Sequence, residues 1–165
     1  MDVVALAAEG ATATRRYRLR EFPRLADVLA GSGGEAEARF RFVQAAAEVA
    51  GCELEVRADA SLRCERCLEP FVETLRSATR LAFVAGKRAA GGVPAGFEEL
   101  ALPSGLVSLR ELVEDELLLS LPLVAKHGEG TACAQRAAPA ANGDDADPQA
   151  GTRRPFAGLK ELLKN

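Results

Sequence analysis

Two cysteines spaced three positions apart, Cys64 and Cys67, have the spacing best suited to chemistry in this chain. Two thiolates at this spacing on a tight turn can bind one metal ion or form a redox pair. Further along, His127, the only histidine, and Cys133 add an imidazole and a third thiol. Together the four side chains make a candidate tetrahedral set for Zn²⁺, with three thiolates and one imidazole.

Two other interpretations of Cys64 and Cys67 stay open. They could be unreactive thiols, although the residues around them are polar and typical of an exposed turn. They could also be a thioredoxin-type dithiol, but that motif follows a strand and opens a helix. Here the cysteines lie between two strand-like runs and precede Pro70, so a dithiol oxidoreductase ranks below a metal site. Cys52, inside one of these runs, is predicted to be a core residue.

The runs on either side of the two cysteines have the period-two pattern of β-strands. From 52 to 62 apolar residues alternate with charged ones, and from 71 to 83 the large apolar residues again share one parity. The pattern predicts a hairpin that carries the paired thiols at its tip. Alternation over 38–43 predicts an earlier strand, and 97–100 a short edge strand.

Helical signals are fewer. Ser108 and Glu111 have the spacing of a capping box, and leucines recur at helical intervals as far as Leu121, where Pro122 discourages continuation. A second, shorter helix is predicted to end near Gly31. The fold class that follows is α+β, with a mainly antiparallel sheet, a few packed helices and a disordered C-terminal linker.

Composition sets the expected domain organisation. The chain has 165 residues, 48% of them hydrophobic, which suits one core. We expect a single globular α+β domain over 1–127. Residues 128–151 are rich in Ala, Gly, Pro and Asp without periodicity and predict a disordered linker. Residues 152–165 predict a short C-terminal docking helix.

Several functional classes find little support in the sequence. The first twenty residues lack the basic start and long apolar run of a signal or anchor, so we expect a cytoplasmic protein without membrane contact. In that compartment cysteines stay reduced. Phosphate-binding loops and dinucleotide fingerprints are missing, and a single histidine leaves little for hydrolytic triads. We therefore expect no enzyme and no small-molecule substrate.

Three blocks, in the same order, resemble the YceD family, the large ribosomal RNA subunit accumulation proteins. The blocks are Cys64–Phe71, then 112–124 with His127 and Cys133 after it, and then Arg154–Ala157. The resemblance covers the chain from about Leu54 onward. It implies a non-enzymatic factor of bacteria and plastids that supports synthesis, processing or stability of large-subunit (23S) ribosomal RNA.

Two hypotheses about the partner follow. The favoured one is a ribosome biogenesis factor that contacts precursor ribosomal RNA or a ribosomal or assembly protein. Arginines predicted to lie on strand faces could contact phosphates, although an ordinary solvated sheet face explains each of them equally well. These arginines are Arg39, Arg41, Arg57, Arg76 and Arg80. The alternative is a zinc-stabilised protein-interaction module that docks through the apolar face of the 109–121 helix or through Phe156.

Overall fold

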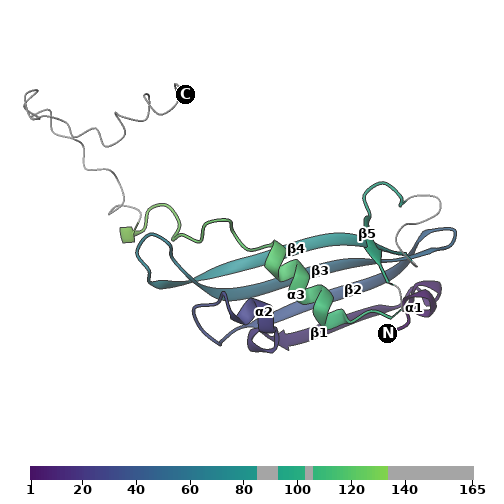
Figure 1. The fold of residues 1–165 in the computed structure, drawn as a ribbon, viewed down its shortest axis with the longest axis horizontal. Helices are drawn as coiled ribbons and strands as arrows, with labels where there is room; N and C mark the ends of the chain where they lie inside the picture. The colour runs from purple at the N-terminus through teal and green to yellow at the C-terminus, as the bar shows by residue number, and fades with distance from the viewer. Residues whose placement is uncertain (85–92, 103–105, 134–165) are drawn as a thin grey trace, which may run out of the picture. The chain divides into compact units, whose positions relative to one another are not determined.

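The computed structural model in Figure 1 describes residues 1–84, 93–102 and 106–133. Contacts divide the chain into two compact units, Met1–Gly128 and Glu129–Asn165. The described elements all belong to the first unit. In chain order they are α1 (Val3–Glu9), β1 (Thr12–Arg18), the 3₁₀ turn η1 (Leu19–Glu21), α2 (Pro23–Ala26), β2 (Glu35–Ala46), β3 (Val49–Arg63), β4 (Pro70–Val84), β5 (Glu98–Ala101) and α3 (Leu109–Leu119).

The five strands form one sheet in sequence order, β1-β2-β3-β4-β5. The first four strands pair antiparallel, whereas β5 pairs parallel with β4, from Leu81 opposite Glu98 to Val84 opposite Ala101. The sheet is therefore mixed but mainly antiparallel, as the sequence predicts. The predicted hairpin is the β3–β4 pair, which is in regular register from Gly51 opposite Ala82 to Arg63 opposite Pro70.

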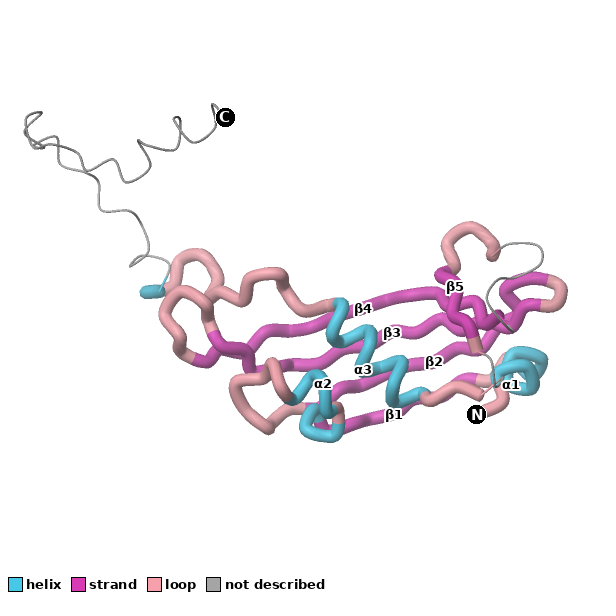
Figure 2. Tube along the Cα trace, viewed as in Figure 1, coloured by secondary structure: helices cyan, strands magenta, loops and turns pink. Residues whose placement is uncertain are grey.

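One face of the sheet carries the core and is covered by helices. Figure 2 shows α3 and α2 lying across this face. The side chains that point to it from the strands are buried because successive residues of a strand point to opposite faces. They include Phe40, Phe42, Leu54, Val56 and Leu75. From α3, Val113 and Leu117 are completely buried among them. The other face carries no helix in the described part of the first unit, and below it is called the open face.

Cys52 lies in the core, as the sequence predicts. It is completely buried, and burial raises the pKa of its thiol to about 12. At neutral pH this thiol is protonated and behaves as a small apolar side chain. Cys52 therefore has no part in metal binding or redox chemistry.

The helix α3 begins where the sequence predicts. The hydroxyl of Ser108 accepts a hydrogen bond from the backbone N–H of Glu111 at 3.4 Å, which caps the first turn. The apolar face of α3 packs on the sheet, so its four core residues are buried rather than available to a partner: Leu109, Leu112, Val113 and Leu117. The prediction that this face docks a protein is therefore wrong.

The N-terminal part differs from the prediction. The strand predicted over 38–43 is the middle of β2, and an additional strand, β1, precedes it. The alternation in β1 is weak because the exposed Arg15 lies between the half-buried Ala13 and Tyr17 on the inward side. The predicted short helix ending near Gly31 is two smaller pieces, η1 and the four-residue α2. Pro23 at the start of α2 favours a new turn there.

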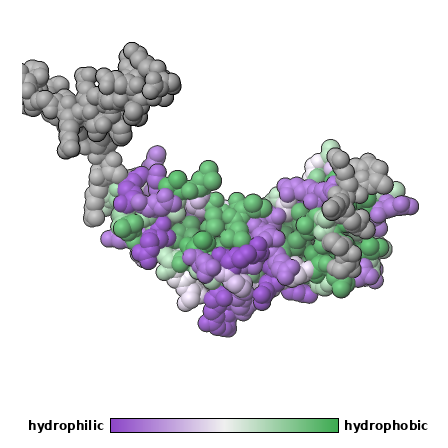
Figure 3. All heavy atoms as spheres, in the orientation of Figure 1, coloured by the Kyte–Doolittle hydropathy of each residue, from purple (hydrophilic) through white to green (hydrophobic). Residues whose placement is uncertain are grey.

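Some predicted segments lie outside the described residues: 134–151 of the expected linker and the C-terminal helix over 152–165. On the helix-covered side, Figure 3 shows hydrophobic and hydrophilic areas next to each other. The exposed apolar residues include Leu119 and Leu123, just after the buried turns of α3. None of the described helices has the length and apolar character needed to cross a membrane.

Candidate functional site

The tip of the β3–β4 hairpin is a tight turn held by its own backbone. The N–H of Cys64 donates to the carbonyl of Glu69 at 2.9 Å, and the N–H of Leu68 donates to the carbonyl of Cys64 at 2.8 Å. Leu68 closes the turn with a positive φ of 64°, a conformation that side chains other than glycine seldom adopt. The turn places the two cysteine side chains three residues apart on one small loop.

A second segment brings His127 to the same turn. The N–H of Glu65 donates to the carbonyl of Ala125 at 2.8 Å, which fixes the chain after α3 beside the hairpin tip. The ring of His127 packs against that of Phe71, with centroids 4.9 Å apart. Its Nδ1 lies 3.5 Å from the Sγ of Cys67. Residues sixty positions apart in the sequence therefore meet through backbone contacts and one aromatic pair.

Cys64, Cys67 and His127 form a cluster with the geometry of metal ligands. One ligand atom from each lies within 4.8 Å of the others. Cys64 is completely buried and Cys67 half-buried, although the residues around them are polar. Two thiolates and an imidazole suit a zinc ion, which binds sulfur and nitrogen ligands in a tetrahedron.

The environment of Cys64 favours its ionised form. Burial by itself would raise the pKa of the thiol, but the backbone amides of Cys67, His127 and Arg66 and the ring of His127 act in the opposite direction. The amide of Arg66 lies 3.4 Å from the sulfur. The net result is a pKa of about 5, well below that of an ordinary thiol. A thiolate held in this way is ready to bind a metal ion, because the thiolate is the form that coordinates.

Cys133 lies in the second unit, six residues after His127 in the sequence. Its side chain is buried, with 8% of its surface exposed. A tetrahedral zinc site needs one donor more than the three side chains that the first unit supplies.

The five arginines predicted to contact phosphates all lie on the open face. They come from β2, β3 and β4, and all five are exposed. The open face of β1 to β4 carries eight arginines and five acidic residues in all. The chain as a whole, in contrast, has a net charge of −3. The open face is therefore positive relative to the rest of the protein. The arginines are Arg16, Arg18, Arg39, Arg41, Arg57, Arg63, Arg76 and Arg80, and the acidic residues are Glu35, Glu37, Glu53, Glu55 and Asp59.

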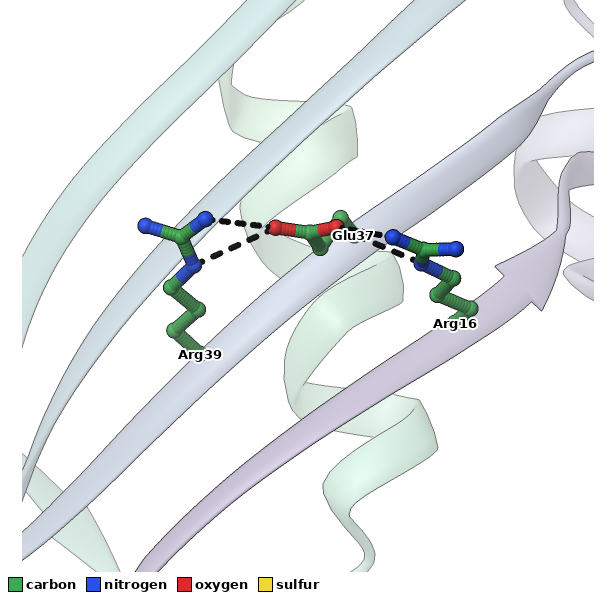
Figure 4. A network of polar contacts seen from close by, with 3 residues as sticks. All are labelled: Arg16, Glu37 and Arg39. Atoms are coloured by element: carbon green, nitrogen blue, oxygen red, sulfur yellow. Dashed lines mark hydrogen bonds and ion pairs between the residues drawn. The ribbon is translucent and has the colours of Figure 1, made fainter.

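Two of these glutamates each bind two arginines. Figure 4 shows Glu37 between Arg16 and Arg39, which approach opposite oxygens of its carboxylate at 3.0 and 2.8 Å. These hydrogen bonds, of which that from Arg16 has the larger effect, hold the pKa of Glu37 below its usual range. In the same way Glu53 accepts from Nε of Arg41 at 2.8 Å and lies 3.3 Å from Nε of Arg80. Each group of one glutamate and two arginines, called a triad below, keeps one net positive charge.

Arg57 and Arg76 differ from the four arginines that Glu37 and Glu53 bind. They lie directly opposite each other on β3 and β4. Neither has an ion pair with any described residue. Both line an open groove of about 570 Å³ on this face. Sequence reasoning missed Arg16 and the roles of Glu37 and Glu53. The register of β1 with β2 reveals the first two, and the registers of β3 with β2 and β4 reveal the role of Glu53.

A second groove, of about 410 Å³, lies on the opposite side of the sheet between α3, β4 and β5. Leucines form much of its lining, and acidic side chains from β5 and α3 complete it. These lining residues are Leu81, Leu100, Leu112, Leu118, Leu119, Glu98, Glu99, Asp115 and Glu116. A groove of this kind suits an apolar segment that carries positive charges.

Together these features define a class: a small α+β protein with a cysteine–histidine cluster at a hairpin tip and a charged, open sheet face. The chain belongs to the YceD family, described as large ribosomal RNA subunit accumulation protein YceD, whose model matches residues 52–163. It is similar to the protein of that name from Haemophilus influenzae, with 30% identity over 112 residues. The match covers 67% of this chain and 64% of that relative. No solved structure matches the chain.

Proposed function

We propose that this protein is a non-enzymatic, cytoplasmic ribosome biogenesis factor that supports synthesis, processing or stability of 23S ribosomal RNA. Membership of a family described by large ribosomal RNA subunit accumulation carries the proposal. Its proposed partners are precursor ribosomal RNA or a ribosomal or assembly protein. The relatively positive open face supports direct contact with RNA, because phosphate contacts supply much of the affinity of proteins for nucleic acids.

A deletion strain tests the biological role. We expect deletion to lower the ratio of 23S to 16S ribosomal RNA, and a plasmid copy of the gene to restore it. Labelled precursor would then separate slow processing from rapid decay. An unchanged ratio under every growth condition tried would contradict the proposed role.

We also propose that Cys64, Cys67, His127 and Cys133 hold one zinc ion. The cluster of the first three supports the proposal. The spacer of five residues after His127 is long enough to bring Cys133 to the cluster, since an extended chain spans about 3.3 Å per residue. The ion would join the chain after α3 to the hairpin tip and would leave no open coordination position for catalysis.

Elemental analysis of protein purified without added metal tests this site. We expect one zinc per chain in the parent, and loss of zinc in Cys64→Ser and in Cys133→Ser. Cys52→Ala is the matched control, because Cys52 is a buried core thiol away from the cluster. Retention of zinc in Cys133→Ser would leave a three-residue site and remove Cys133 from the proposal.

A protein-interaction module is the second candidate function. The leucine-lined groove beside α3 favours it, since Leu119 is 77% exposed at its edge. Large exposed leucines next to a groove are typical of docking surfaces. Leu119→Asp should then abolish capture of a basic ribosomal protein while leaving RNA binding unchanged. Equal capture by the parent and by this variant would exclude the groove.

A further inference from the structure

Arg57 and Arg76 make a pairing that the fold by itself does not favour. Directly opposite residues of antiparallel strands have their Cβ atoms about 5 Å apart, and like charges at this distance repel each other. Arg57 faces Arg76 on one side and Glu37 on the other. Both oxygens of Glu37, however, are already engaged by Arg16 and Arg39.

The other acidic residues near this pair lie two positions before and two positions after Arg57 on β3. Glu55 and Asp59 flank Arg57 on the same face, about 6.7 Å away along the strand. Asp59 accepts a hydrogen bond from the hydroxyl of Thr74 at 2.7 Å. In the described part of the chain neither acid forms an ion pair with Arg57 or Arg76. Two guanidinium groups thus face one groove without a bound carboxylate.

We propose that Arg57 and Arg76 together bind one backbone phosphate of single-stranded RNA in this groove. The proposal rests on the RNA contact proposed above and specifies where it occurs. Guanidinium groups suit phosphate because their planar N–H groups match two of its oxygens. The carboxylate of Glu55, in the same groove, can accept from the amino group of an unpaired base. Single strands expose such base edges, whereas duplex RNA hides them.

The same geometry assigns a different role to the four arginines of the two triads. Arg41 and Arg80 are held by Glu53, as Arg16 and Arg39 are held by Glu37. A phosphate at these positions would have to compete with a carboxylate that is already bound. The two triads therefore brace the sheet face, and Arg57 and Arg76 receive the ligand.

Binding of fluorescein-labelled, single-stranded fragments of bacterial 23S ribosomal RNA, measured over a series of salt concentrations, tests the proposal. We expect Arg57→Gln/Arg76→Gln to lose affinity about tenfold or more. We expect its salt slope to fall by about 0.7, because the two arginines share one phosphate and each phosphate contact on a single strand contributes about 0.7. Arg41→Gln/Arg80→Gln is the matched control: it removes the same charge from the same face and should lose less than about threefold.

The possible results separate this inference from the proposed function. If the parent binds RNA and both double variants weaken equally, the face acts only through its overall charge and the inference is wrong. Unchanged binding in Arg57→Gln/Arg76→Gln would also overturn it. If the parent binds none of the RNA fragments, direct RNA contact fails, whereas the biological role is still judged by the deletion strain. A further variant, Arg57→Lys/Arg76→Lys, keeps the charge. It should bind RNA more tightly than the glutamine double variant and less tightly than the parent.

Discussion

Glu114 is a buried carboxylate whose partners come from another helix. It is 4% exposed and lies on α3. It accepts hydrogen bonds from the backbone N–H groups of Arg24 and Leu25 at 2.7 and 3.3 Å and from the guanidinium of Arg24 at 3.0 Å. These contacts join α2 to α3. Because α2 has only four residues, it depends on such contacts for its position.

We expect Glu114→Ala to lower the free energy of unfolding by about 2–4 kcal/mol, because the buried N–H of Leu25, the partly buried N–H of Arg24 and its guanidinium lose their acceptor. Asp115→Ala is the matched control. Asp115 binds the same arginine at 2.7 Å but is half exposed, so its loss should cost less than about 1 kcal/mol. Urea unfolding followed by circular dichroism measures both. Equal losses would show that the backbone contacts of Glu114 contribute little.

Glu114 also predicts how stability depends on pH. Burial by itself would raise the pKa of this carboxyl, but the hydrogen bonds from Arg24 and Leu25 outweigh it and keep the pKa below the ordinary value of 4.5. A lowered pKa in the fold stabilises the protein above about pH 4.5, and this stabilisation is lost as the pH falls through the folded pKa. Glu114→Gln should therefore flatten the acid side of the stability profile. A profile with the same acid slope as the parent would contradict this.

The Arg57–Arg76 pair predicts an effect on stability as well as on binding. Replacing Arg76 with threonine removes the repulsion across the strands and adds a residue that favours strands. We expect Arg76→Thr to raise the free energy of unfolding by about 0.2–1 kcal/mol. Arg80→Thr, which removes a partner of Glu53, should leave it unchanged or lower it. A less stable Arg76→Thr protein would mean that the two guanidiniums are not repelling each other.

At the scale of elements, the entry into β2 depends on one glycine. Gly34 has φ +107° and its carbonyl accepts from the N–H of Leu19 at 3.1 Å. A Cβ there would lie 2.7 Å from the carbonyl oxygen of Asp59 and 2.8 Å from a methyl group of Leu19. The backbone of β2 can therefore approach β3 and η1 this closely only without a side chain.

We expect Gly34→Ala to lower the free energy of unfolding by about 1–3 kcal/mol, from both the positive φ and the contacts. Gly33→Ala is the control, because nothing lies within 4 Å of a Cβ at that position. Its effect should stay within about 0.5 kcal/mol. Thermal unfolding of the two proteins, compared with the parent, gives the difference directly. An equal and small effect at both positions would show that β2 can shift to accept the methyl group.

The sequence predicted the central elements because their patterns are strong. The β3–β4 hairpin alternates over most of its length, and α3 has a cap and a regular apolar face, so both were predicted with nearly their observed bounds. β1 was not predicted, because Arg15 lies between Ala13 and Tyr17 on its inward side and interrupts the apolar alternation. The parallel pairing of β5 also could not be predicted, since a four-residue strand carries no signal of its direction.

The candidate site was predictable in part for similar reasons. The spacing of Cys64 and Cys67 is a local signal, and the strand alternation placed the five arginines on one face. Which carboxylate binds which arginine depends on the register between strands, and the sequence does not specify it. Glu37 and Arg16 are twenty-one residues apart and meet only because β1 and β2 pair in one register.

At the scale of the whole molecule, the proposed zinc site links the segment that follows α3 to the hairpin tip. Removal of the ion should therefore act locally, because the core and the triads lie elsewhere on the sheet. We expect a strong chelator to speed hydrogen exchange at the tip, around Cys64–Glu69, while the centre of β3 stays protected. Cys67→Ser should show the faster exchange without chelator. Uniformly faster exchange over the whole sheet would indicate that the ion is needed for the global fold.

The order of the strands has a consequence for how the protein is made. Each strand from β2 to β4 pairs with the strand synthesised just before it, so the sheet can assemble from the N-terminus as the chain leaves the ribosome. The helix α3, which packs on β3 and β4, comes later, at residues 109–119. During that interval the apolar face of the sheet is covered only in part, because α1 packs on β2 and β3 but α3 is still missing. A pause in translation before α3 emerges would therefore prolong the stage at which the chain is most prone to aggregate.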